Sequence, residues 1–151
     1  MKGLSLYTID MTEKELSQSG TKTQKQIVGT IGEDAVCTYL KRKGFKVIDR
    51  NYFKKWGELD VVAIKDKKIH FIEVKSVSRK FEDVPHETRV GYRPEDNMHP
   101  WKLQRLARTI QSYVLDKNIS DDTEWQFDVA TVYVDQEKRL CKVIMLEDVI
   151  L

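Results

Sequence analysis

Cysteine and proline are both scarce in this chain of 151 residues, which contains two cysteines and three prolines. Cys37 and Cys141 lie far apart in the sequence and lack the close spacing of zinc ligands. We therefore interpret both as reduced thiols in or near the core rather than as a disulfide or a zinc site. All three prolines fall between residues 76 and 100, and we expect this polar stretch to form a long loop at about 76–99.

Long apolar runs and a strong charge of one sign are also missing. No run approaches the ~20 apolar residues of a membrane span, and the first residues do not resemble a signal peptide. We therefore expect a cytoplasmic protein without a membrane partner. The formal net charge is only +2, so binding to nucleic acid would need a local basic patch rather than bulk charge.

What the chain does contain is an unusual pair of predicted strands. Residues 57–75 read GELDVVAIKDKKIHFIEVK, two apolar runs joined by a charged turn, which is typical of a hairpin. Asp60 opens the first run, while Glu73 and Lys75 interrupt the end of the second. Ionised groups among apolar neighbours are costly to bury unless they pair or hold a metal. Because side chains alternate along a strand, Phe71, Glu73 and Lys75 share one face.

This arrangement suits metal-dependent cleavage of a phosphodiester. Carboxylates such as those of Asp60 and Glu73 are hard oxygen ligands for Mg²⁺ or Mn²⁺, and a bound metal polarises a phosphoryl oxygen and activates a water. Lys75 would lie close enough to orient that water or to neutralise developing charge. The alternative, from the residues alone, is an exposed Glu–Lys pair on an edge strand, which contributes only ~0.5 kcal/mol.

Two segments, GTIGEDAVCTYLKRKGF at residues 29–45 and NYFKKWGELDVVAIKDKKIHFIEVKS at residues 51–76, resemble the YraN-like family of bacterial restriction-endonuclease-like proteins. That family belongs to the PD-(D/E)xK nuclease superfamily, which also holds Holliday-junction resolvases. The resemblance implies that Asp60 and Glu73 bind the metal, that Lys75 is the catalytic lysine, and that Glu33 is a further site carboxylate. It also implies Mg²⁺ or Mn²⁺ as cofactor, DNA (branched or single-stranded DNA included) as partner, and a homodimer.

Glu33 falls within a helix predicted from Thr23 to Lys43, at the edge of its apolar arc. From the residues alone it is either a solvated flank of the helix or a site residue, and the resemblance favours the site. Gly29 and Gly32 lie in the same helix, where each costs about 1 kcal/mol. Close approach of another backbone or a phosphate would explain them, and so would tight packing of the helix on a sheet.

Two basic groups are candidates for contact with nucleic acid. Lys54, Lys55 and Trp56 come just before the predicted site, where they would contact phosphate and stack on a base. An equally good reading of Trp56 is that it covers the core at the entrance of a strand. Lys102 and Arg105 lie on the second predicted helix and would bind phosphates beside the site. The alternative is that they simply form the solvent-exposed face of the helix, which is the usual place of charged residues.

The overall organisation predicted is one domain behind a short tail. We expect residues 1–20 to be an irregular N-terminal tail and residues 21–151 to form a single nuclease-like domain. The order αβββαββ predicts an α/β (α+β) fold, with a mixed central sheet flanked by helices in a restriction-endonuclease-like core. The predicted elements after the first helix are strands at Phe45–Asp49, 61–64 and 70–74, a helix at Trp101–Lys117, and strands at Trp125–Val134 and Arg139–Met145.

These observations lead to two functional hypotheses. The first is a Mg²⁺-dependent nuclease, a hydrolase that acts on DNA as an endonuclease or a resolvase-like phosphodiesterase. The second is a catalytically inactive nucleic-acid-binding or assembly module that keeps the nuclease fold. The intact set of Asp60, Glu73 and Lys75 favours the enzyme, because a decayed site need not keep all three.

Overall fold

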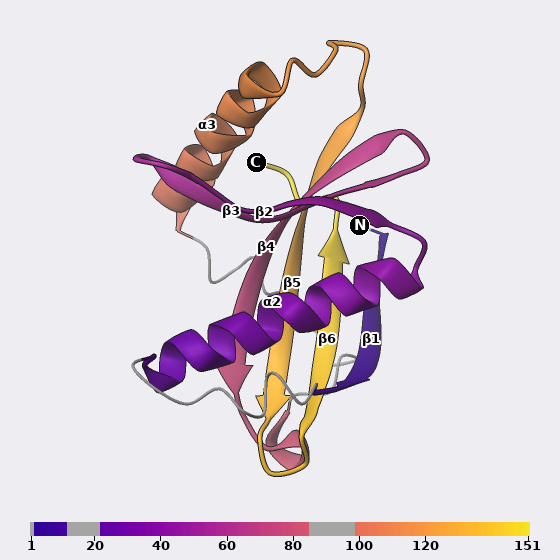
Figure 1. Cartoon of the computed structure of the whole chain (residues 1–151), viewed down its shortest axis with the longest axis vertical. Coiled ribbons are helices and arrows are strands. Elements are labelled where there is room, and N and C mark those ends of the chain that lie inside the picture. Colours follow the sequence, from indigo (N-terminus) through magenta and orange to yellow (C-terminus); the bar gives the residue numbers. More distant parts are fainter. Residues whose placement is uncertain (1, 12–21, 85–98) are drawn as a thin grey trace.

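A computed structural model describes residues 2–11, 22–84 and 99–151 of the chain (Figure 1). Its strands form one six-stranded sheet in the order β1-β6-β5-β4-β3-β2, in which β4 and β5 run parallel and every other neighbouring pair is antiparallel. The predicted mixed α+β fold is therefore confirmed. The elements are β1 (Lys2–Asp10), α2 (Gln24–Arg42), β2 (Lys46–Lys54), β3 (Gly57–Lys65), β4 (Lys68–Ser78), a 3₁₀ turn (Phe81–Asp83), α3 (Pro100–Asp116), β5 (Trp125–Asp135) and β6 (Leu140–Glu147).

The prediction of an irregular tail over residues 1–20 is wrong for its first half. Lys2–Asp10 forms β1, which pairs antiparallel with β6 at the edge of the sheet. The physical reason is that the outer edge of β6 carries backbone N–H and C=O groups that need partners. Ile9, which is almost fully buried, adds an apolar anchor to the core. Residues 12–21 lie outside the described part of the chain.

The loop predicted at about 76–99 begins later than expected. Strand β4 continues through Ser78, and the amide of Arg79 still donates to Val134 of β5 at 3.0 Å. A 3₁₀ turn follows, in which the amide of Phe81 donates to Asp135 Oδ2 at 2.9 Å. The backbone around 78–83 is therefore fixed by β5, and residues 85–98 of the predicted loop lie outside the described residues.

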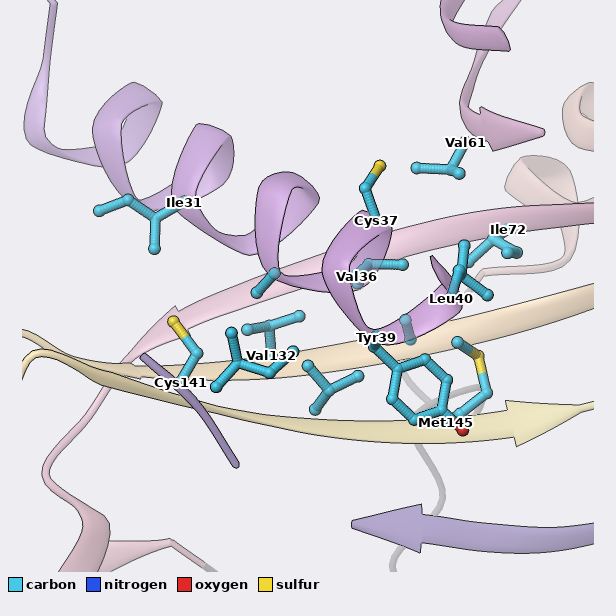
Figure 2. Close-up of a cluster of buried hydrophobic side chains, with 14 of the residues drawn as sticks. Ile31, Val36, Cys37, Tyr39, Leu40, Val61, Ile72, Val132, Cys141 and Met145 are labelled. Carbon is cyan, nitrogen blue, oxygen red and sulfur yellow. The ribbon is translucent and has the colours of Figure 1, made fainter. Parts of the chain in front are cut away.

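Each face of the sheet carries one helix and one apolar core (Figure 1). Neighbouring residues of β4 divide between them, since Ile72 packs in the α2 core and Phe71 in the α3 core. Cys37 and Cys141 are both reduced cysteines buried in the α2 core, as predicted (Figure 2). Other members of the α2 core include Ile31, Val36, Leu40, Val61, Val132 and Met145, and those of the α3 core include Leu59, Leu106, Ile110, Tyr113, Phe127 and Val129.

Helix α2 begins and ends as its sequence predicts. The Thr23 hydroxyl accepts from the amide of Gln26 at 3.2 Å, and the Gln26 side chain accepts from the amide of Thr23 at 2.9 Å, which completes a capping box. After Lys43 the chain reaches Gly44, whose φ of +86° lies in the left-handed region that glycine adopts without a side-chain clash. The helix is thereby fixed at both ends over the sheet.

The two glycines of α2 differ in their surroundings. A Cβ at position 32 would lie 1.8 Å from Ser76 Oγ and 2.9 Å from Ser76 Cβ, so Gly32 allows α2 to approach β4 closely. A Cβ at position 29 would meet nothing within 4 Å. Tight helix–sheet packing therefore explains Gly32 and leaves Gly29 without a packing reason.

The first prediction concerns this pair of glycines. We expect Gly32→Ala to lower the free energy of unfolding by ~1–3 kcal/mol, because the new methyl group overlaps Ser76 and forces the helix from the sheet. Gly29→Ala should raise it by up to ~1 kcal/mol, because alanine favours the helix and has room. Urea unfolding followed by circular dichroism measures both values.

Ser76→Ala provides the matched control for that experiment. It removes the Oγ atom nearest to the added methyl group, so it should restore part of the stability lost in Gly32→Ala. Equal effects of the two glycine substitutions would contradict the packing argument.

Candidate metal and nucleic-acid site

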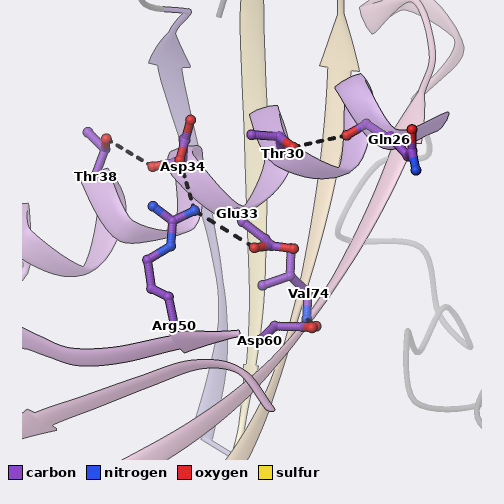
Figure 3. A network of polar contacts seen from close by, with 8 residues as sticks. All are labelled: Gln26, Thr30, Glu33, Asp34, Thr38, Arg50, Asp60 and Val74. Atoms are coloured by element: carbon purple, nitrogen blue, oxygen red, sulfur yellow. Dashed lines mark hydrogen bonds and ion pairs between the residues drawn. The ribbon is translucent and has the colours of Figure 1, made fainter. Parts of the chain in front are cut away.

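The candidate site lies where β3 and β4 separate. Their antiparallel register runs from Val61 opposite Ile72 to Lys65 opposite Lys68. Before Val61, β3 continues beside β2, and after Ile72, β4 continues beside β5. Asp60 lies at this fork, and its Oδ2 accepts from the backbone amide of Val74 at 2.8 Å (Figure 3). The carboxylate thus replaces the backbone carbonyl that a neighbouring strand would offer to this amide. This hydrogen bond holds the Asp60 side chain in place.

Asp60 and Glu73 face each other across the fork. Burial and the negative charge of Glu73 together raise the pKa of Asp60 to about 8. Such a shift is the signature of two carboxylates that repel each other in a poorly solvated place. A divalent cation between them would offset that repulsion, and one or two carboxylates with water and phosphate are the usual protein ligands of Mg²⁺. The donor set therefore fits a magnesium ion.

Two lysines lie near Glu73, which is only 9% exposed. Lys102, from the first turn of α3, places its Nζ 3.1 Å from Glu73 Oε1. Lys75 is half-buried on the same face of β4 as Glu73, and burial together with the charge of Lys102 lowers its pKa. A lysine whose charge is disfavoured in this way gives up a proton more readily than an exposed one.

Glu33 approaches the fork from α2, on the other side of the sheet. Its pKa is raised by burial, which the nearby charge of Arg50 opposes, at 3.7 Å between Arg50 Nη2 and Glu33 Oε1 (Figure 3). Arg50 also pairs with Asp34 at 2.9 Å. The charge of Glu33 contributes to the raised pKa of Asp60, so the two carboxylates sense each other.

Asn51 connects Glu33 to the other wall of the fork. With its amide oriented to satisfy both carboxylates, its nitrogen donates to Glu33 Oε1 at 2.9 Å and to Glu58 Oε1 at 3.1 Å. Asn51 has a φ of +53° at the point where β2 passes Asp60. Burial and the charge of Glu73 raise the pKa of Glu58, so this carboxylate belongs to the same electrostatic cluster.

A cleft of about 550 Å³ opens over Asp60 and Glu73. One wall is the β2–β3 turn with Lys54 and Lys55, and the other is the start of α3 with Lys102 and Arg105. Four of the five residues predicted to contact nucleic acid therefore line one cleft with the two predicted metal ligands. The full lining comprises Phe53, Lys54, Lys55, Gly57, Glu58, Asp60, Glu73, Trp101, Lys102, Arg105 and Leu106.

Trp56, the fifth predicted residue, packs against α3. Its Nε1 donates to Ser112 Oγ at 3.2 Å, and the guanidinium of Arg108 lies 4.3 Å from its ring centroid. The aromatic side chains in the cleft are instead Phe53 and Trp101, which the sequence analysis did not select. Their position next to the basic residues Lys54 and Lys102 was the available signal.

A separate cluster is formed by residues of β4, β5 and β6. Within the described residues, the one set of three His, Cys, Asp or Glu side chains with ligand atoms within 4.8 Å of one another is His70, Asp128 and Glu147. Asp128 lies 2.8 Å from His70 Nδ1 and accepts from Gln126 Nε2 and the amide of Asp148. These bonds satisfy a buried carboxylate that holds the end of β6 against β5.

The six-stranded mixed sheet and its two helices are consistent with a restriction-endonuclease-like core, the fold class of PD-(D/E)xK nuclease-like proteins. The model of the uncharacterised protein family UPF0102 matches residues 32–132, and the chain belongs to this family, the YraN family that the sequence resembled. It is 39% identical to a UPF0102 protein of Campylobacter lari over 114 residues, 76% of this chain and 90% of that protein. A UPF0102 protein of Campylobacter fetus is 31% identical over 115 residues, covering 76% of this chain and 89% of its own.

A UPF0102 protein of Helicobacter hepaticus shows 37% identity over 92 residues, which cover 61% of this chain and 73% of that relative. The matched family segment contains Glu33, Asp60, Glu73 and Lys75. As for the membrane, neither helix in the described residues is both long and apolar enough to cross one.

The second prediction tests the electrostatics of the fork. The folded protein holds the Asp60 proton up to about pH 8, whereas an unfolded chain releases it near ~3.9. The contribution of Asp60 to the free energy of unfolding is therefore most favourable below about pH 4 and declines as the pH rises towards 8. We expect Asp60→Asn to be more heat-stable than wild type above about pH 8 in metal-free buffer, with the difference shrinking at lower pH.

Asparagine suits this test because its Oδ1 still accepts from the amide of Val74. Asp121→Asn, at an exposed carboxylate in the turn before β5, is the matched control for the same chemical substitution outside the fork. A melting-temperature difference for Asp60→Asn that stays constant across the pH series would contradict the proposed repulsion between Asp60 and Glu73.

Proposed function

We propose that the protein is a metal-dependent nuclease that hydrolyses phosphodiester bonds of DNA in the cleft over the fork of β3 and β4. The observation that carries this proposal is the close pair of carboxylates, Asp60 and Glu73, at the floor of a cleft with basic walls. Carboxylates alone would repel a phosphodiester. Paired with a divalent cation and flanked by lysine and arginine, they become a site for one.

Mg²⁺ or Mn²⁺ would be held by Asp60 and Glu73, with Glu33 as a further carboxylate on the α2 side. When bound, the ion supplies a polarised phosphoryl oxygen and an activated water. The protein's own residues hold these carboxylates in position. The amide of Val74 fixes the Asp60 carboxylate, and the bridging amide of Asn51 holds Glu33 near Glu58.

Lys75 is the proposed catalytic lysine. On the same face of β4 as Glu73, it would lie near a phosphate bound at the metal, and its lowered pKa favours accepting a proton from the attacking water or donating a hydrogen bond to it. Lys102, which contacts Glu73 at 3.1 Å, would move to a phosphate oxygen once the charge of Glu73 is taken up by the metal.

The same ion pair favours the second candidate function. The ammonium group of Lys102 neutralises the carboxylate of Glu73, which the nuclease would need to bind its metal. A nucleic-acid-binding or assembly module would keep Lys102 there permanently and would bind DNA without a metal. In that case, replacing Asp60 would leave DNA binding unchanged.

The third prediction separates these two functions. We expect the wild-type protein to cleave DNA in Mg²⁺ or Mn²⁺, tested on linear duplex, single-stranded and four-way-junction substrates. Asp60→Asn and Glu73→Gln should lower the cleavage rate by at least ~10²-fold, and Lys75→Met by about 10²–10⁴-fold. Calorimetric titration of Mn²⁺ should show binding that is lost in the double variant Asp60→Asn/Glu73→Gln.

Asp121→Asn again serves as the matched control, because it removes an exposed carboxylate far along the chain and should cleave like wild type. Equal cleavage rates for wild type and Asp60→Asn would contradict the assignment as a nuclease. Metal-independent DNA binding without cleavage of any substrate would establish the binding module in its place.

A further inference from the structure

Two large apolar rings are exposed in the cleft. Phe53 is 70% exposed and Trp101 is 52% exposed, although rings of this size usually bury most of their surface. Other exposed apolar side chains, such as Leu115 and Trp125, lie outside the cleft lining. Neither Phe53 nor Trp101 belongs to either apolar core, so the fold does not need them there.

The two rings come from opposite walls. Phe53 belongs to β2, next to Lys54 and Lys55, and Trp101 belongs to the first turn of α3, next to Lys102. The cleft therefore presents a ring and a cation on each side of the carboxylate floor. Exposed apolar surface gathered at a concave site marks a place where a ligand binds.

The three lysines beside the rings differ in whether they already have an ion-pair partner, and therefore in how readily they can bind a phosphate. Lys55 is exposed and has no ion-pair partner among the described residues. Lys54 is paired with Asp116 at 2.9 Å, and Lys102 with Glu73 at 3.1 Å. A phosphate backbone that follows the cleft would meet Lys55 first and would compete for the other two.

Trp101 is held in place although half of it is exposed. The guanidinium of Arg105 lies 5.5 Å from its ring centroid, and the same side chain donates through Nε to the carbonyl of Trp56 at 2.7 Å. The His99 ring also lies 6.0 Å from the Trp101 ring, centroid to centroid, so Arg105 and His99 together support the orientation of Trp101 while half of its surface stays exposed. Phe53 has no ring or cation contact among the described residues, so its faces are open to a ligand.

We propose that the cleft binds a single-stranded DNA segment whose unstacked bases lie on Phe53 and Trp101 while Lys54, Lys55 and Lys102 contact its phosphates. The physical reason for a single strand is that paired bases in a duplex hide their faces in the stack, and only an unstacked base offers a face to an aromatic ring. The inference rests on the proposed function in one respect: the strand occupies the cleft that holds Asp60 and Glu73.

The fourth prediction is a binding measurement that needs no catalysis. Fluorescence anisotropy in EDTA compares a labelled thymidine oligonucleotide, an abasic strand of the same length and a blunt duplex. Wild type should bind the thymidine strand most tightly. Phe53→Ala and Trp101→Ala should each weaken that binding about tenfold, which is ~1.4 kcal/mol and at the low end of what one stacked base contributes.

The abasic strand isolates the stacking contribution because it keeps the phosphates and lacks the bases. Neither alanine substitution should change its affinity, and the ring-preserving Phe53→Tyr and Trp101→Phe should retain the preference for the thymidine strand. Leu115→Ala is the matched control, since Leu115 is 76% exposed on the same helix as Trp101 and lies outside the cleft.

Three outcomes would overturn the inference. These are equal affinity for the thymidine and abasic strands, unchanged binding in both alanine variants, and a uridine RNA strand that binds more tightly than DNA. Cleavage assays on the same variants keep the two proposals separate. Base-dependent binding without metal-dependent cleavage would preserve this inference and reject the nuclease, and cleavage without base dependence would do the reverse.

Discussion

The hydrogen bond between the amide of Val74 and the carboxylate of Asp60 is the constraint on which the site depends. Where β3 leaves β4, the β4 amides that point towards β3 lose their strand partners, and a buried amide without an acceptor is costly. Asp60 supplies the acceptor from the strand that turns away. The same side chain therefore allows the sheet to divide and places a carboxylate at the point of division. Glu73, Glu58 and Glu33 then gather around it because the fork is where β4, β3 and α2 meet.

This arrangement stores electrostatic repulsion in the folded protein. Burial and neighbouring charge raise the pKa of Asp60, Glu58 and Glu33, so each carboxylate is less favourable here than in water. Shifted pKa values of this kind cluster at functional sites. The basic walls supply the opposite charge, through Lys102 in contact with Glu73 and through Lys54, Lys55 and Arg105 elsewhere in the cleft lining. The chain's small net charge thus conceals a strong separation of charge within one cleft.

Much of the fold followed from the sequence, because periodicity and caps act locally. Helix α2 was predicted from its apolar arc, and Thr23 and Gly44 mark its ends as expected. Strand β1 was missed because its order depends on the edge of β6, far away in the chain. The approach of Asp60 to Glu73 was expected because they lie on the two consecutive strands of the predicted hairpin, and their roles as metal ligands remain predictions. The exposure of Phe53 and Trp101 could not be predicted from the sequence. It depends on how α3 packs beside the β2–β3 turn, and that packing decides which aromatic rings are buried in the core.

The contacts of Trp56 have a consequence for how the cleft meets a ligand. Trp56 lies in the turn that forms one wall, and its bonds to Arg105 and Ser112 tie that turn to the helix that forms the other. Gly57 adds to this brace, because a Cβ there would lie 2.4 Å from Thr109 Oγ1. The two walls are therefore joined by these contacts, which oppose their separation. The width of the cleft is set during folding rather than at the moment of encounter, so association needs little reorganisation of the backbone, and affinity depends on side chains already in place.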